Sequence, residues 1–306
     1  AMILYLDNQQ SSGPNSQLAR LSSRRQGRGD NEQRKIGINE NLAREILELH
    51  TLGVNGGYTQ QDVTTFAQAL TGWSVGGGRG RLAQGSQGEF VFRDLVHEPG
   101  AKTILGRKYE ESGQAQAHAV LEDLAKHPAT AKHVATKLVR HFIADEPPAA
   151  AVEKVAQAFR DSEGHLPTVH AAVINCAEAW NKPFAKFKTP HEFVISTFRA
   201  LNFVSPQGNA IAAPLELLGQ RPYTPGSPAG WPDTASQWDG PDALMKRIEW
   251  ATAVAQRAGN ALTPAKIAQE ALGANLSDHT RTAIARAASG SQALTLLLMS
   301  PEFQKR

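Results

Sequence analysis

The sequence predicts a mainly α-helical protein: a single helical domain with an antiparallel helical core and one small β-ribbon. Apolar residues recur at helical spacing through most of the 306 residues. The alternation of strands and helices that indicates an α/β sheet is absent, as is any repeat of fixed period. Two short extended segments flank a glycine-rich stretch within residues 73–93, which predicts the ribbon.

Composition excludes several classes of function. The hydrophobic content of 41% is enough for a substantial core, whereas the net charge of +3 is small for this length. We therefore expect neither nucleic-acid binding nor adsorption to an anionic membrane. Cys176 is the only cysteine, so an intrachain disulfide and a cysteine-based zinc site are excluded. No run of about 18 apolar residues occurs, which predicts that no segment spans a membrane.

The first clear element is a helix over residues 39–53. Asn39 suits the N-cap, Glu40 places negative charge in the first turn, and Gly53 can end the helix in a left-handed conformation. Arg44 lies one turn after Glu40 on the polar face. His50 falls on the apolar arc, so we expect it to be a buried structural residue bonded to a carbonyl group.

A second helix begins after Thr59, which is a suitable N-cap, and the short turn before it makes an αα-hairpin. Before this hairpin, residues 9–38 are polar and rich in arginine, which predicts a solvated basic loop; binding of a polyanion is the alternative. After the ribbon, His97, Glu98 and Lys102 fall together in a turn. A side chain that bonds its own backbone is the expected role of His97, and a functional role is the alternative.

The rest of the chain is predicted helical except for residues 220–240. This segment has four prolines between Arg221 and Asp239, with Trp231 and Trp238, and neither helical nor strand periodicity. Unstructured connections of this length in compact domains are commonly lids or binding loops. The interpretation we favour is that the two tryptophans anchor the loop to the core, and the alternative is a binding surface.

Four stretches carry a family resemblance. They are INENLAREILELHTLGVNGGYTQQDVTTFAQALTGW, HPATAKHVATKLVRHFIADEPP, KTPHEFVISTFRAL and SPAGWPD. The chain resembles the uncharacterised bacterial family catalogued as domain of unknown function 1800, DUF1800, without its N-terminal part. The resemblance implies a largely helical exported protein, periplasmic or extracellular, often encoded beside an exported protein with a sulfatase-like fold. It implies no particular activity.

Candidate site residues follow from these patterns. We expect one cleft between the loop of residues 220–240 and the N-terminal end of the Asn39 helix, because helix N–H groups and tryptophan faces complement each other in a pocket. The catalytic candidates are Glu40, Glu45, His50 and His97. The binding candidates are Asn39, Arg44, Trp231, Asp233 and Trp238. We expect no metal site and no cofactor, since the histidines are mostly isolated along the sequence.

Three classes of function are compatible with the sequence. The one we favour is a binding or accessory protein for an extracytoplasmic polymer or a partner protein, with a polysaccharide or the sulfatase-like protein as the expected partner. The first alternative is a hydrolase or lyase that acts on a polar polymer with a carboxylate and a histidine as acid and base. The second is a structural interaction protein. No recognised catalytic motif is present to decide whether it is an enzyme.

Overall fold

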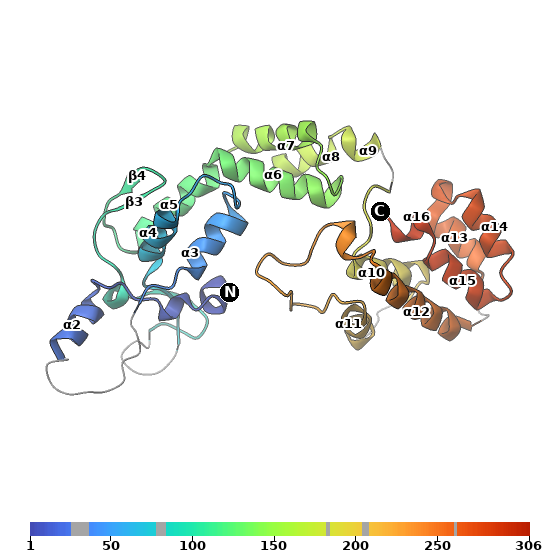
Figure 1. Ribbon diagram of the computed structural model, residues 1–306, viewed down its shortest axis with the longest axis horizontal. Helices are drawn as coiled ribbons and strands as arrows, with labels where there is room; N and C mark the ends of the chain where they lie inside the picture. Colours follow the sequence, from blue (N-terminus) through green and yellow to red (C-terminus); the bar gives the residue numbers. More distant parts are fainter. Residues whose placement is uncertain (26–36, 78–83, 182–183, 204–207, 260–261) are drawn as a thin grey trace. The chain divides into compact units, whose positions relative to one another are not determined.

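The computed structural model describes residues 1–25, 37–77, 84–181, 184–203, 208–259 and 262–306. Helices dominate these residues (Figure 1). The strands that the structure describes form two small antiparallel sheets of two strands each. The prediction of a mainly α-helical fold is confirmed. In the described residues, no helix combines the length and the apolar character needed to cross a bilayer.

The chain divides into two compact units. The first comprises Ala1–Ala135 and Ala156–Val169, and the second comprises Thr136–Val155 and His170–Arg306. The division falls within three helices, α6 (Pro128–Phe142), α7 (Ala149–Asp161) and α8 (Leu166–Ile174). That the chain forms one domain stays a prediction.

The first unit is built around the predicted αα-hairpin. Its helices and strands are α1 (Met2–Tyr5), α2 (Gln17–Arg25), α3 (Asn41–Glu45), α4 (Gln60–Leu70), β1 (Trp73–Val75), β2 (Phe90–Phe92), β3 (Lys102–Ile104), β4 (Arg107–Tyr109) and α5 (Gln114–Lys126). Thr59 and Asp62 form a capping box at the start of α4, as a threonine N-cap predicts. Leu47 of the first arm and Phe66 of α4 are fully buried in the same apolar cluster.

The first arm of the hairpin changes its helical form halfway. After α3 it continues as a π-helix over Ile46–His50, which takes one more residue per turn than an α-helix. The wider turn shifts the later side chains around the axis, so His50 is exposed although a regular helix would place it on the apolar arc. The prediction that His50 is a buried structural residue is therefore wrong. Gly53 ends the arm with a φ of 83°, as predicted.

A partly buried histidine from α6, His133, makes the bond to a carbonyl group that was predicted for His50. Nε2 of His133 lies 3.0 Å from the carbonyl oxygen of Leu49, within the π-helix, and donates to it. Gly53 approaches the same imidazole so closely that a Cβ atom there would lie 2.6 Å from Nδ1 of His133. The end of the π-helix is thus held by a side chain that follows it by 84 positions.

The predicted β-ribbon is present, and a second one accompanies it. Strands β1 and β2 pair antiparallel, with Trp73 opposite Phe92, while the glycine-rich residues 78–83 lie outside the described residues. Strands β3 and β4 form the second ribbon, which the sequence analysis missed. Its two-residue turn places both Leu105 (φ 51°) and Gly106 (φ 76°) in the left-handed region. Leucine is unusual there, and its N–H group donates to Asp62 at 2.7 Å.

The predicted basic loop of residues 9–38 is partly helical, which corrects that prediction. Helix α2 begins after Ser16, whose hydroxyl accepts from the backbone nitrogen of Ala19 at 3.2 Å. A serine at this position satisfies a helix N–H group, which the arginine-rich composition concealed. The remainder of the basic run, residues 26–36, lies outside the described residues.

The second unit has a helical core of its own. Besides parts of α6, α7 and α8, its helices are α9 (Glu178–Asn181), α10 (Pro190–Ala200), α11 (Gly208–Leu217), α12 (Pro241–Ala258), α13 (Pro264–Leu272), α14 (Asp278–Ala285), α15 (Gly290–Leu298) and α16 (Pro301–Gln304). Phe193, Trp250 and Leu297 belong to its apolar cluster. Figure 1 shows α12 to α16 gathered in the C-terminal part of the chain, coloured orange to red.

A buried arginine joins three segments of this second core. Arg247 of α12 is 1% exposed, and its guanidinium donates to Oε1 of Gln304 at 2.8 Å and to the carbonyl oxygen of Lys188 at 2.7 Å. The rings of Phe187 and Phe193 lie 4.5 and 5.1 Å from its central carbon. These contacts fix the start of α10 against α12 and α16, because breaking them would leave a buried charge unpaired.

Candidate functional site

The candidate residues of the first unit fall into three separate environments. The first surrounds Glu40, whose carboxylate accepts from Thr64 at 2.7 Å, from Gln60 at 2.8 Å and from Arg44 at 3.2 Å. The hydrogen bond from Thr64, more than the others, holds the pKa of Glu40 below its ordinary value, against the opposite effect of burial. A carboxylate so occupied is a poor general acid at neutral pH.

Asn39 bonds to different groups from those that bind Glu40, whereas Arg44 belongs to the Glu40 network. Oδ1 of Asn39 accepts from the backbone nitrogen of Asn41 at 2.9 Å, and its Nδ2 donates to the carbonyl oxygen of Leu6 at 2.9 Å. Arg44 also donates to Gln60 at 2.8 Å. Asn39 precedes the N-cap position, which Glu40 occupies, by one residue. These contacts tie the start of α3 to its neighbours.

Glu45 and His50 stand on either side of the π-turn and do not form an acid and base pair in the described contacts. Glu45 ends α3, and its Oε2 atom is buried without a hydrogen-bond partner among the described residues. His50 is exposed at the other end of the π-helix. Neither side chain has, among the described residues, a partner that would orient it for proton transfer.

Besides the Glu40 network and the π-turn with Glu45 and His50, the remaining environment is a buried polar cluster. It is formed by His97, Glu98 and Lys102, each about 5% exposed or less. Nδ1 of His97 lies 2.8 Å from the carbonyl oxygen of Thr71 and donates to it, because a carbonyl oxygen only accepts. The Glu98 carboxylate accepts from the backbone and the side chain of Asn15 at 2.8 and 2.7 Å. Nε2 of His97 lies 3.3 Å from a carboxylate oxygen of Glu111. His97 is therefore bound by groups outside its own turn, and the expectation that it bonds its own backbone is wrong.

The second unit contains a cluster that joins the segments of the family resemblance. Lys186, two residues before the KTPHEF stretch, is 2% exposed and bonds to a carboxylate oxygen of Asp145 and to the carbonyl oxygen of Asp233. The other Asp145 oxygen accepts from the backbone nitrogen of Ala235 at 2.6 Å. Asp145 belongs to the HPATAKHV stretch and Asp233 to SPAGWPD. A buried lysine therefore fixes the loop to the residues that follow α6.

A histidine completes this cluster at the surface. Nδ1 of His141 lies 3.0 Å from Oδ1 of Asp233, and the imidazole and the carboxylate are 42% and 24% exposed. Since the carboxylate accepts, Nδ1 carries the proton and Nε2 is the atom left to accept from another group. Arg306 holds the backbone of the same histidine, since its guanidinium donates to the His141 carbonyl oxygen at 2.9 Å.

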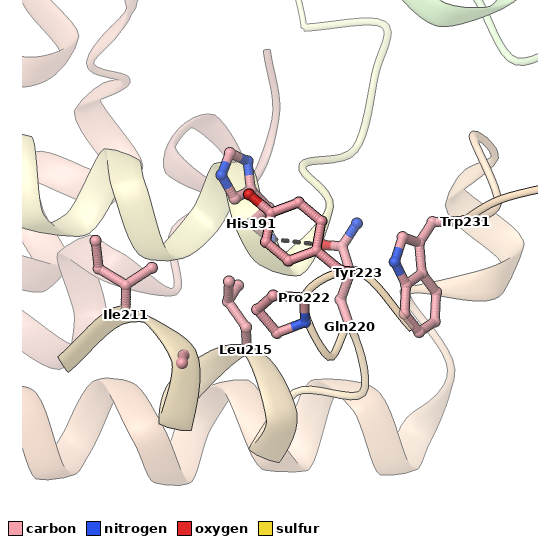
Figure 2. A pocket seen from close by; sticks show the side chains of 8 residues that line it. His191, Ile211, Leu215, Gln220, Pro222, Tyr223 and Trp231 are labelled. Atoms are coloured by element: carbon pink, nitrogen blue, oxygen red, sulfur yellow. Dashed lines mark hydrogen bonds between the residues drawn. The ribbon is translucent and has the colours of Figure 1, made fainter. Parts of the chain in front are cut away.

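A pocket of about 530 Å³ lies next to the fixed loop. Its lining residues are His191, Ile211, Ala212, Leu215, Gln220, Pro222, Tyr223 and Trp231. In Figure 2, Ile211 and Leu215 line it from helix α11, while Tyr223 and Trp231 line it from the loop. The dashed line in the figure joins Gln220 and His191, where the Gln220 side-chain oxygen accepts from the His191 backbone nitrogen at 2.7 Å.

The two loop tryptophans have different roles. Trp238 is 6% exposed, and its indole N–H donates to the carbonyl oxygen of Pro232 at 3.0 Å, so it anchors the loop as the favoured interpretation predicts. Trp231 is partly exposed and lines the pocket, with its ring 6.2 Å from that of Trp238. Tyr223 is fully exposed. The buried tryptophan thus supports the exposed one, which the sequence pattern does not distinguish.

The cleft predicted between Asn39 and Trp231 stays a prediction. Asn39 belongs to the first unit and Trp231 to the second. The same holds for the predicted absence of a metal: the described residues contain no group of three His, Cys, Asp or Glu side chains that could hold an ion. Of the Asp145–Lys186–Asp233–His141 cluster, only Asp233 was among the predicted candidates. The other three residues, and the contribution of Tyr223 and His191, were missed because their partners are distant in sequence. The available signal was the resemblance, whose segments contain or adjoin all four cluster residues.

Comparison with known proteins gives one family. The family described as "Protein of unknown function (DUF1800)" matches residues 1–305. No curated protein and no solved structure matches the chain.

Proposed function

Because the chain belongs to the DUF1800 family, whose description names no activity, we propose its function from the pocket: it is an extracytoplasmic binding protein for a polysaccharide. The observation that carries the proposal is that two aromatic side chains, the exposed Tyr223 and the partly exposed Trp231, line one pocket. The pocket volume of about 530 Å³ is within the range of small-ligand sites, roughly 300 to 1,000 Å³.

The chemistry of the lining suits a sugar chain. A pyranose ring has apolar C–H faces and polar hydroxyl edges, and aromatic faces bind the former while amide and imidazole groups bind the latter. Tyr223 and Trp231 supply the aromatic faces, and the side chains of Gln220 and His191 supply the polar groups. Most of the remaining lining is apolar, as is usual for sites in which a few polar groups set the orientation.

Rigidity of the loop favours binding further. Trp238 is buried, Pro222 and Pro232 restrict the backbone, and Asp145 and Lys186 hold the residues that follow Trp231. A surface that is ordered before binding loses less conformational entropy when the ligand arrives. This preorganisation is expected of a binding site and is not needed by a loop that only connects two helices.

Location and partners belong to the same proposal. The family resemblance supports export to the periplasm or beyond, where polysaccharides are exposed to a soluble protein. An exported sulfatase-like protein is the proposed protein partner. Cell fractionation of the native host tests the location, and co-purification of the two exported proteins tests the partnership.

The binding proposal is tested with the full chain and soluble polysaccharides of neutral and acidic type. We expect retardation in affinity electrophoresis for at least one of them, with Trp231→Ala and Tyr223→Ala each weakening binding about tenfold or more, the scale on which an anchor side chain contributes. Trp180→Ala is the matched control, because Trp180 is 73% exposed in the same unit but does not line this pocket. If Trp231→Ala binds like the parent, the pocket is not the site. If no polysaccharide binds but a peptide library does, the ligand class is wrong.

A second candidate function is hydrolysis or elimination on the same polymer. The His141–Asp233 pair favours it, because Asp233 orients the imidazole and leaves Nε2 to take a proton from water or from a sugar carbon. Asp233 lies only two residues from Trp231 in the chain. Incubation with a bound polysaccharide should then release shorter products, and His141→Gln should abolish release while leaving binding intact. Absence of products with the parent protein excludes this candidate.

A further inference from the structure

A second pocket of the same unit contains an unusual lysine. Its volume is about 570 Å³. The lining residues are Lys188, Ser196, Arg199, Ala200, Asn202, Glu270, Ala271, Leu272 and Phe303. None of them lines the pocket that contains Tyr223 and Trp231, so the two pockets are built from separate side chains.

In the part of the chain that the structure describes, the amine of Lys188 forms no ion pair with a carboxylate. Its Nζ atom donates to the carbonyl oxygen of Phe303 at 2.6 Å and lies 4.4 Å from the centre of the Phe303 ring. Among the described residues no carboxylate lies within 4.0 Å of it, unlike Lys186 and Lys246, which pair with Asp145 and Asp242. Burial lowers the pKa of Lys188 to about 8, with Glu192 opposing this effect and Arg247 adding to it.

Among the charged residues that line the pocket, the cations Lys188 and Arg199 outnumber the single carboxylate, Glu270. Arg199 is exposed at the end of α10 and adds a second cation. The Glu270 carboxylate, which is 66% exposed, lies 3.7 Å from Lys266 and is partly neutralised by it. Helix α10 ends here, but its last carbonyl groups, those of Thr197 and Arg199 among them, already accept from the backbone nitrogens of Leu201 and Asn202. Their partial negative charge is therefore reduced.

We propose that this pocket is a binding site for a small oxyanion, a molecule carrying a carboxylate or phosphate group, with Lys188 and Arg199 as its charged contacts. The planar guanidinium of Arg199 can hold two oxygens of such a group, and the ammonium of Lys188 adds a point charge. Ser196 and Asn202 supply a hydroxyl and an amide for further hydrogen bonds. An oxyanion would provide the direct ion-pair partner that the described residues do not give to Lys188.

The first test uses the reactivity of the lysine. The full chain is acylated at pH 8 with limiting acetic anhydride, in sodium chloride or in inorganic phosphate, sulfate or citrate of equal ionic strength, and each lysine is quantified by peptide mass spectrometry. We expect phosphate or citrate to slow acylation of Lys188 at least fivefold and to leave Lys246 unchanged. Equal rates at Lys188 in all salts, or equal slowing at both lysines, would overturn the proposal.

Variants form the second test and separate binding from folding. Lys188→Met and Arg199→Gln should each weaken anion binding about tenfold or more in calorimetric titrations with phosphate and citrate, whereas Lys246→Met should not. Arg199 is exposed, so Arg199→Gln decides the matter if Lys188→Met does not fold. If Arg199→Gln binds phosphate and citrate with the affinity of the parent protein, the pocket is not the anion-binding site. Binding of phosphate but not citrate identifies a phosphate group as the ligand, and the reverse identifies a carboxylate.

Discussion

His141 and Asp233, 92 positions apart in the chain, are joined by a contact of 3.0 Å between Nδ1 and Oδ1. Asp233 also offers its carbonyl oxygen to the buried amine of Lys186, so one residue links a surface imidazole to an internal ion pair. Through Asp145, the same ion pair reaches the backbone of Ala235. The loop that carries Trp231 is therefore fixed from the side of α6 by charged groups.

The Asp145–Lys186 pair predicts a large and non-additive effect on stability. Asp145→Leu leaves the Lys186 ammonium buried without its carboxylate, and we expect a loss of about 3 kcal/mol in the free energy of unfolding, since removing one partner of a buried pair leaves the other charge unpaired. Urea denaturation of Asp145→Leu, Lys186→Met and the double variant measures the coupling. The loss in the free energy of unfolding for the double variant should be smaller than the sum of the losses for the two single variants. A loss equal to that sum would show that the two charges do not interact.

The exchange of roles between His50 and His133 gives a direct comparison. His50→Ala should change the free energy of unfolding by less than about 0.5 kcal/mol, because the side chain is exposed. His133→Ala removes the donor to the Leu49 carbonyl oxygen and should cost about 1 to 3 kcal/mol. Chemical denaturation of both variants under the same conditions shows which histidine contributes more to the free energy of unfolding. A larger loss for His50→Ala would mean that the π-turn is absent in solution.

Gly53 and Gly57 separate backbone strain from crowding. Both have a φ of 83°, so replacement of either by alanine carries a similar conformational cost, on the order of 1 kcal/mol. A Cβ atom at residue 53 would also lie 2.6 Å from Nδ1 of His133, whereas at residue 57 nothing lies within 4 Å. Gly53→Ala should therefore lower the melting temperature clearly more than Gly57→Ala. Equal shifts would argue against the close approach of His133.

Lys188 makes stability depend on pH in the alkaline range. Its pKa is about 8 in the folded protein and near 10.4 in an unfolded chain, so between these values the unfolded state binds more protons and stability rises with pH. Below pH 8 the buried charge of Lys188 lowers the free energy of unfolding. As the pH rises towards 10.4 this loss disappears, and stability increases by on the order of 3 kcal/mol. Unfolding curves of the parent and of Lys188→Met, recorded between pH 7 and 10.4, give the difference in their free energies of unfolding at each pH. A difference that is constant over this range would contradict the lowered pKa.

Local chemistry within the sequence was enough to determine the helical character of the protein and much of its first hairpin. Thr59 with Asp62, Gly53 at a helix end and the apolar faces of α4 act on neighbours a few residues away, so their effect can be read directly. The ribbon of β1 and β2 was likewise predicted from its extended segments. The resemblance of four stretches correctly indicated the family.

Tertiary structure alone decided which side chains meet. The π-turn that exposes His50, the left-handed Leu105 and the burial of Lys186 each depend on a partner far along the chain, namely His133, Asp62 and Asp145. Periodicity describes which face of an element is apolar, but it contains no information on the distant carbonyl or carboxylate that satisfies a buried donor. For the same reason the sequence predicted the same role for Trp231 and Trp238. The tertiary structure shows that Trp238 is buried and anchors the loop, whereas Trp231 lines the pocket.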